Sequence, residues 1–117
     1  MKIKQHIIKD VQLAELERDG FKIESFSDGL DVMANAGGAR KVIIYKEQMM
    51  PEFFDLSTGI AGEILQKFVT YGVQIAIVGD FSEYTSQSFK DFIFECNNGN
   101  SIFFVSSFDE ATEYLTR

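Results

Sequence analysis

The chain has 117 residues, of which 45% are hydrophobic and 12 are phenylalanine, so it carries enough apolar material for one packed domain and is not a disordered chain. Its formal net charge of -7 argues against binding to nucleic acid phosphates or to anionic membranes, since both depend on basic residues. The single cysteine allows no internal disulfide, which favours a reducing compartment and predicts a cytoplasmic protein.

The first nine residues do not have the pattern of a targeting segment. They start basic, but the apolar pair Ile7-Ile8 is followed at once by Lys9, so no apolar stretch of the length of a signal peptide develops. The longest apolar runs elsewhere are also far too short to span a bilayer. We therefore expect neither a signal peptide nor a membrane anchor.

Two short strands are predicted at the start of the chain, over residues 2–8 and 11–17. Lys9-Asp10 between them has the length of a hairpin turn. Asp19-Gly20 is the next turn signal, and the residues from 21 to 25 are predicted as a short extended piece.

A helix and a buried strand come next. Ser27 can cap a helix over residues 28–36, and the glycine pair at 37–38 ends it. The apolar run at 42–45 predicts a strand that is covered on both faces. Pro51, the only proline, falls in the connection that follows.

The second predicted helix has the clearest helical spacing, over residues 58–71. One side is apolar and the other polar, and Gly72 ends it. The strand at 73–78 follows as an uninterrupted apolar run and is expected to be the most buried of all. The apolar side of the helix is formed by Ile60, Ala61, Ile64, Leu65, Phe68 and Val69.

The last third of the chain repeats the same alternation. Ser86 or Ser88 begins a third helix, which ends at Asn98-Gly99, and a strand is predicted over 102–105. Ser107 and Glu110 then form a capping box for a terminal helix to about residue 116.

The predicted order is therefore β-β-α-β-α-β-α-β-α in a single domain over residues 1–117. Strands that alternate with helices pair in parallel through right-handed crossovers. The predicted fold class is α/β, with a mostly parallel central sheet and covering helices.

The stretch Asp55-Leu56-Ser57-Thr58-Gly59-Ile60-Ala61-Gly62 opens the second helix. It resembles the Asp-Ser-Ser/Thr-Gly-Leu-Gly motif of the STAS domain, the fold of bacterial anti-sigma-factor antagonists, although Leu56 is inserted where the family has Asp and Ser adjacent. The order of elements and the ending "IFFVSSFDEATEYL" are similar to that family too. This resemblance implies a bacterial, STAS-like regulatory or protein-interaction module without catalysis.

Two further resemblances carry different implications. Through "FFDLSTGIAGEILQKF" and "AIVGDF", the whole chain resembles a family of small bacterial domains with no established function. "AIVGDF" and "FDEATEYL" are also similar to SpoIIAA-like domains, whose fold is shared with lipid-carrier proteins. The latter resemblance, with the Phe and Met content, implies an alternative function as a module that binds a small apolar or lipid-like ligand.

Ser57 is the first candidate site residue, because the antagonist family carries its phosphorylated hydroxyl at this position. A phosphate at a helix N-terminus meets free N–H groups and adds charge that repels an acidic partner. The alternative is that Ser57 is only an N-cap, which stabilises a helix by about 1 kcal/mol over alanine.

Four neighbours of Ser57 complete a candidate partner-binding surface. Glycine inside a helix costs about 1 kcal/mol against alanine. Gly59 and Gly62 therefore predict that something approaches the backbone closely, either a partner or a neighbouring loop. Asp55 and Thr58 belong to the same motif.

Several other residues have two interpretations each. Phe94 lies off the apolar side of the third helix, where it either contacts a partner or, as we expect, is covered by a neighbouring helix. The apolar residues Met49, Met50, Phe53 and Phe54 border a ligand site or, more simply, plug the end of the core. Cys96 lies among apolar helical residues, which predicts a buried, inert thiol.

No constellation for catalysis is recognisable. His6 is the only histidine and cannot supply a His pair for a metal, and the acidic residues Asp55, Asp80 and Glu83 are only a weak metal candidate. No nucleophile elbow, P-loop or Rossmann fingerprint is present. We therefore predict no catalytic residue, no metal and no cofactor, with an enzyme of unrecognised type as a second alternative. The expected partner is a protein, and a homodimer remains open.

Overall fold

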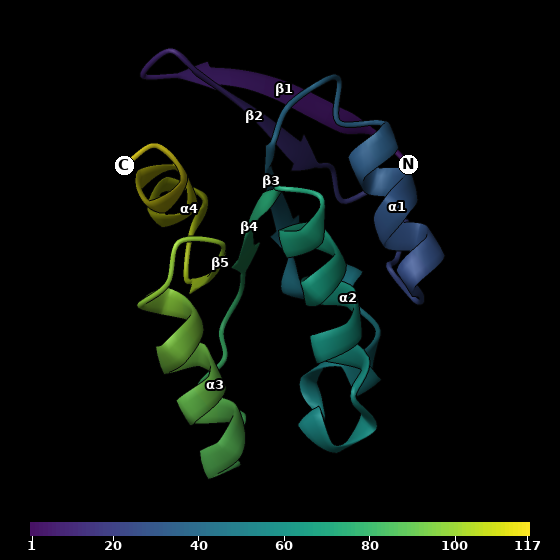
Figure 1. Ribbon diagram of the computed structural model, residues 1–117, viewed down its shortest axis with the longest axis vertical. Coiled ribbons are helices and arrows are strands. Elements are labelled where there is room, and N and C mark those ends of the chain that lie inside the picture. The colour runs from purple at the N-terminus through teal and green to yellow at the C-terminus, as the bar shows by residue number, and fades with distance from the viewer.

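A computed structural model describes all residues, 1–117. Five strands form one sheet, and their order in space is their order in the chain (Figure 1). β1 runs antiparallel to β2, and the three other neighbouring pairs are parallel, as predicted. The strands are β1 (Ile3–Ile8), β2 (Val11–Leu16), β3 (Lys41–Tyr45), β4 (Gln74–Val78) and β5 (Ile102–Val105).

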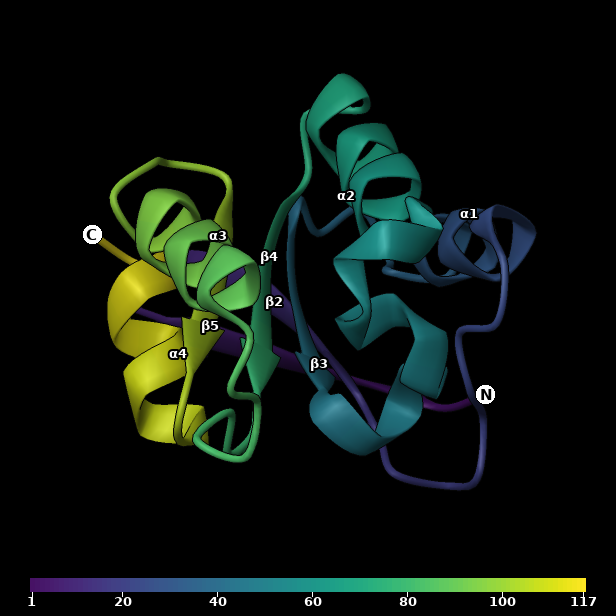
Figure 2. The same cartoon turned by 90° about the horizontal axis from the view of Figure 1, so that it is seen from below.

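Four helices cover the two faces of this sheet unequally. The sheet grows in one direction, so successive right-handed crossovers place the first three helices on the same face. α4 follows the last strand and packs on the opposite face. The helices are α1 (Phe26–Ala34), α2 (Ile60–Thr70), α3 (Gln87–Asn97) and α4 (Phe108–Leu115), and Figure 2 shows α1 beside α2.

The core is divided by the sheet. The larger part lies under α1, α2 and α3, where Phe53, Phe68 and Phe89 are completely buried. The smaller part lies under α4 and is built by residues such as Ile43, Phe103 and Leu115. β3 and β4 are both buried after their first residue, so the strand at 73–78 is not more buried than its neighbour β3.

The hairpin of β1 and β2 closes as predicted. Lys9 and Asp10 have φ angles of 53° and 63°, the left-handed conformation that a two-residue hairpin turn needs to match the strand twist. β2 then pairs with β3 through two residue pairs, whereas β3 and β4 share five. The expected extended piece near Ser25 is a single parallel bridge between Ile23 and Met49.

Two helix starts were predicted wrongly. α1 begins earlier than expected, because Ser25, not Ser27, accepts the N–H of Asp28 at 3.2 Å. α2 begins at Ile60, not at residue 58, because Gly59 takes a left-handed φ of 76° that interrupts the helix. The later caps agree with the sequence: Ser86 begins α3 and Ser107 begins α4.

The connection between β3 and α2 is ordered into short 3-10 turns. These turns lie at Lys46–Gln48, Pro51–Phe54 and Leu56–Thr58. They carry Met49, Phe53 and Phe54 into the larger core, and Met50 packs against it half-buried. Met49 and Phe54 also line a surface cleft, so both interpretations of this loop stand.

Phe94 and Cys96 lie on different sides of α3. The side chain of Phe94 is 71% exposed, so the expectation that a neighbouring helix covers it was wrong. Burial raises the pKa of the Cys96 thiol to about 11, which keeps it protonated at neutral pH. None of the four helices is both long enough and apolar enough to cross a bilayer.

Candidate functional site

The predicted site at the start of α2 is a tight turn around Asp55. One carboxylate oxygen of Asp55 accepts two hydrogen bonds from Ser57, from its backbone N–H at 3.0 Å and from its hydroxyl at 2.6 Å. These bonds stabilise the carboxylate and lower the pKa of Asp55. The turn spans residues i to i+2, so the intervening Leu56 is the residue that lets Asp55 reach Ser57.

Ser57 is exposed but is not the N-cap of α2. The cap position belongs to Gly59, and the Ser57 hydroxyl donates to Asp55 instead of accepting an N–H of the helix. Thr58 supports the start of α2, since its hydroxyl oxygen accepts the N–H of Ile60 at 3.2 Å. The same hydroxyl lies 2.8 Å from the carbonyl oxygen of Asp55 and 3.0 Å from that of Glu52. The interpretation of Ser57 as a simple cap was therefore wrong.

Gly59 and Gly62 both face open space. A Cβ atom built on either residue would meet no other atom within 4 Å. Gly59 has a backbone reason to be glycine, its φ of 76°. Gly62 has none, because it lies within α2 and no loop of the chain approaches it. Of the two explanations that the sequence left open, the neighbouring loop is excluded.

A second turn of the same kind lies at the end of β4. Asp80 accepts the backbone N–H of Ser82 at 2.9 Å and its hydroxyl at 2.6 Å, which lowers the pKa of Asp80. Lys46 donates to the Asp80 carbonyl oxygen and pairs with Glu83. No three carboxylates gather into a group that could hold a metal, so Asp55, Asp80 and Glu83 do not converge.

The two larger of the three surface clefts both border the larger core. One, of about 400 Å³, lies beside the 3-10 turns and is lined by Lys22, Lys46, Glu47, Met49, Pro51, Phe54 and Tyr84. The other, of about 370 Å³, lies between α1 and the end of α2 and is lined mostly by apolar residues, with Arg40 at its rim. Neither cleft includes Ser57 or the two glycines.

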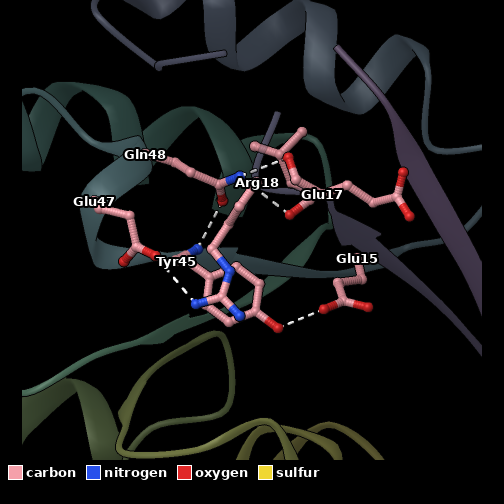
Figure 3. Close-up of polar contacts among 7 residues, drawn as sticks. Glu15, Glu17, Arg18, Tyr45, Glu47 and Gln48 are labelled. Atoms are coloured by element: carbon pink, nitrogen blue, oxygen red, sulfur yellow. Dashed lines mark hydrogen bonds and ion pairs between the residues drawn. The ribbon is translucent and has the colours of Figure 1, made fainter. Parts of the chain in front are cut away.

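The sequence reasoning missed a polar network on the face that α4 leaves partly open (Figure 3). Glu15 on β2 accepts a hydrogen bond from the Tyr45 hydroxyl, as Figure 3 shows. It also accepts one from His6 Nε2, at 2.9 Å. Arg18 lies over the Tyr45 ring, 4.0 Å from its centre, and donates to Glu47 at 3.2 Å. The network therefore joins β1, β2, β3 and the first 3-10 turn.

The protonation states of Glu15 and Tyr45 complement each other. Burial alone would raise the pKa of Glu15, but the hydrogen bonds from Tyr45 and His6 outweigh it and lower the pKa. Burial and the bond to Glu15 raise the pKa of Tyr45 to about 12. At neutral pH Tyr45 is the donor and Glu15 the charged acceptor. The pair joins β2 to β3, and Glu47 at the end of the network also lines the cleft beside the 3-10 turns.

Gln48 adds hydrogen bonds to the backbone of Tyr45, Leu16 and Glu17. It is the one buried polar side chain, and its amide accepts the backbone N–H of Tyr45 at 2.9 Å. The same amide donates to the carbonyl oxygens of Leu16 and Glu17. It continues the connection between β2 and β3 beyond the point where their direct pairing stops.

Of the three resemblances, the comparisons with known proteins agree with that of the whole chain to a family with no established function. Neither the STAS nor the SpoIIAA-like family gives a match to this chain. No curated protein and no solved structure matches it. Residues 8–115 match the family described as "Domain of unknown function (DUF4180)", and the chain belongs to this family.

Proposed function

We propose that this domain is a non-enzymatic regulatory or protein-interaction module of STAS-like type, which docks a protein partner at the start of α2. The observation that carries the proposal is the open surface at Gly59 and Gly62, where neither a packing contact nor a loop explains the second glycine. A bare helical backbone at an exposed position allows a partner to approach closely. Phe53 and Phe68 are completely buried in the core beneath it, so this surface lies over packed side chains.

Phosphorylation of Ser57 is the proposed switch. The Ser57 hydroxyl is exposed and bonded only to a carboxylate, whereas the Thr58 hydroxyl supports the backbone at the start of α2. A kinase would transfer the terminal phosphoryl group of a nucleoside triphosphate to Ser57 Oγ, which gives up its proton. The phosphate then faces the Asp55 carboxylate, and its charge of about -1.5 to -2 changes both the turn and the docking surface.

The experiment compares two serines that sit in matching turns. Ser57→Asp and Ser82→Asp place the same charge beside Asp55 and beside Asp80. Affinity purification from the native cells should recover a partner with wild type and with Ser82→Asp, but not with Ser57→Asp, while mass spectrometry finds phosphate on Ser57. Equal recovery with both variants, from folded proteins, would remove Ser57 as the switch.

Binding of a small apolar or lipid-like ligand is the second candidate function. It is supported by the cleft of about 370 Å³ between α1 and α2, a volume within the range of small-molecule sites. Apolar side chains such as Leu30 and Met33 line it, and Arg40 can meet a carboxylate at the rim. A medium-chain fatty acid should then raise the melting temperature of wild type but not of Met33→Glu. No shift with wild type would reject this candidate.

A further inference from the structure

The two edge strands of the sheet, β1 and β5, differ in whether their outward backbone N–H and C=O groups have hydrogen-bond partners. At the outer edge of β5, the Asn97 amide donates to the Phe104 carbonyl oxygen at 3.1 Å and accepts the Phe104 N–H at 2.8 Å. Glu110 accepts the N–H of Ser106 at 2.9 Å, just beyond the strand. Side chains thus occupy the place of a further strand at this edge.

The outer edge of β1 has no such protection. In an antiparallel pair, every second residue of a strand exchanges hydrogen bonds with its neighbour. Ile8 pairs with Val11 across the two-residue turn, and the Lys2 carbonyl oxygen accepts the N–H of Glu17. The even-numbered residues of β1 therefore direct their N–H and C=O groups towards β2. The N–H and C=O groups of Ile3, Gln5 and Ile7 therefore point outward. No side chain bonds to them, and Figure 1 shows no helix across this edge.

The side chains along β1 favour an acidic partner. Lys2, Lys4 and Lys9 lie on or beside β1, which itself carries no carboxylate, and Glu15 lies opposite Lys4 on the neighbouring β2. The side chain of Ile7 is 77% exposed. The edge therefore offers backbone groups, an apolar contact and positive charge together.

We propose that the outer edge of β1 binds an extended acidic segment of a partner protein, which adds to the sheet as a strand antiparallel to β1. The side chains opposite Ile3 and Ile7 would be apolar, and those opposite Lys4 and His6 would be acidic. Backbone hydrogen bonds supply affinity in this mode, and alternate side chains supply specificity.

A second copy of the chain fits this edge less well. Antiparallel self-pairing centred on Gln5 sets Ile3 against Ile7, but it sets Lys4 against His6. It also sets Lys4 of one copy diagonally across from Lys4 of the other, about 7–8 Å away. Lysine on an edge strand is a known means of preventing such pairing.

The test uses the whole chain and two synthetic peptides of about ten residues, long enough to cover one strand. One has Val-Glu-Thr-Glu-Val at its centre, and the other has lysine in place of both glutamates. Fluorescence anisotropy measures the Kd of each. The acidic peptide should bind about tenfold more tightly at low salt, and the difference should shrink as salt screens the charges.

Two variants of the chain locate the binding. Ile7→Pro removes an outward N–H and leaves the hydrogen bonds to β2 intact, so it should weaken binding about tenfold, whereas the control Ile7→Val should not. Because proline can disturb β1, a double charge reversal, Lys2→Glu with Lys9→Glu, provides a second test. It should reverse the preference between the two peptides.

Hydrogen exchange tests the proposal at single backbone amides, because only every second amide of β1 points outward. The acidic peptide should slow exchange at the amides of Ile3, Gln5 and Ile7, while the amides that face β2 are protected with or without it. Equal affinity for the two peptides, protection at α2 in place of β1, or a dimer that Ile7→Pro dissociates would each overturn the proposal. Ser57→Asp should bind the acidic peptide as wild type does, so this test is independent of the proposed function.

Discussion

On one face of the sheet, α1, α2 and α3 bury a core of 20 residues, while on the other α4 covers a core of 9. The first face is held by apolar packing from three helices. The second leaves the β1–β2 hairpin partly open, and there Glu15, His6, Tyr45 and Arg18 connect the strands through polar contacts. Packing should thus resist changes of pH, whereas the polar network should respond to them.

Truncation in the larger core should have the largest effect. Phe68 is fully buried between α2 and the sheet, so Phe68→Ala should lower the free energy of unfolding by about 3–5 kcal/mol. Urea unfolding followed by circular dichroism measures this. Phe94→Ala is the control, since Phe94 is exposed on α3 and its loss should change stability by less than about 0.5 kcal/mol. Similar losses from both would contradict the assignment of the core.

Removal of the Tyr45 hydroxyl should have the next largest effect. Tyr45→Phe leaves Glu15 without one of its two hydrogen-bond donors, and a hydrogen bond to a charged group contributes about 1.5–3 kcal/mol. The control is Tyr71→Phe, because the Tyr71 side chain is 53% exposed at the end of α2. Unchanged stability in Tyr45→Phe would mean that the network is not what holds β2 to β3.

The pH dependence of stability tests the polar network, because its two ionisable partners Glu15 and Tyr45 have shifted pKa values. The folded state lowers the pKa of Glu15 below its ordinary 4.5, so its stabilisation is complete above that value and is lost as the pH falls through the lower, folded pKa. Tyr45 has the opposite sign: its pKa rises from 10.0 to about 12, so its stabilisation is present below pH 10 and is lost towards pH 12.

Glu15→Gln should flatten the acid end of this pH profile and reduce the alkaline end, because it removes the charged acceptor of the Tyr45 hydroxyl but not the burial that is the larger cause of the raised Tyr45 pKa. Asp55 and Asp80 also have lowered pKa values and lose stabilisation in the same acid range. The relevant measurement is therefore the difference in melting temperature between wild type and Glu15→Gln across pH. A constant difference from acid to alkaline pH would show that Glu15 and Tyr45 do not titrate as described.

The smallest effects are expected on the outer side of α2, which packs against nothing. Gly62→Ala should stabilise the protein by about 0.5–1 kcal/mol, because alanine favours the helix and the added Cβ meets open space. Gly59→Ala should destabilise it by about 1–2 kcal/mol, because the φ of 76° is strained for alanine. Thermal unfolding of the two variants measures these opposite signs. Destabilisation by Gly62→Ala would mean that this side of α2 is covered.

Much of the fold could be predicted because local signals agreed with the final packing. Apolar runs marked β3, β4 and β5, and helical spacing marked α2. The start of α2 was misplaced because Ser57 and Gly59 are both good cap residues, and only the left-handed φ of Gly59 decides between them. That angle depends on the 3-10 turns before it, and these short turns have no periodic pattern of apolar residues from which they could be predicted.

The polar network was predictable only in part. Once Lys9-Asp10 is taken as a two-residue turn, the hairpin register puts Lys4 opposite Glu15 and His6 diagonally beside it, so the contact of His6 with Glu15 follows from sequence. The contact of Tyr45 with Glu15 does not, because the parallel register of β2 and β3 depends on the long crossover through α1. The same crossover positions Arg18 over the Tyr45 ring.

Only two residue pairs join β2 to β3, so the backbone alone ties the hairpin weakly to the parallel sheet. The side chains of β2 supply the rest of the attachment, because Leu13 enters the smaller core while Ala14 and Leu16 enter the larger one, and all three are completely buried. β2 is therefore the one element of the hairpin that both cores share, and a substitution in it disturbs both faces of the sheet at once.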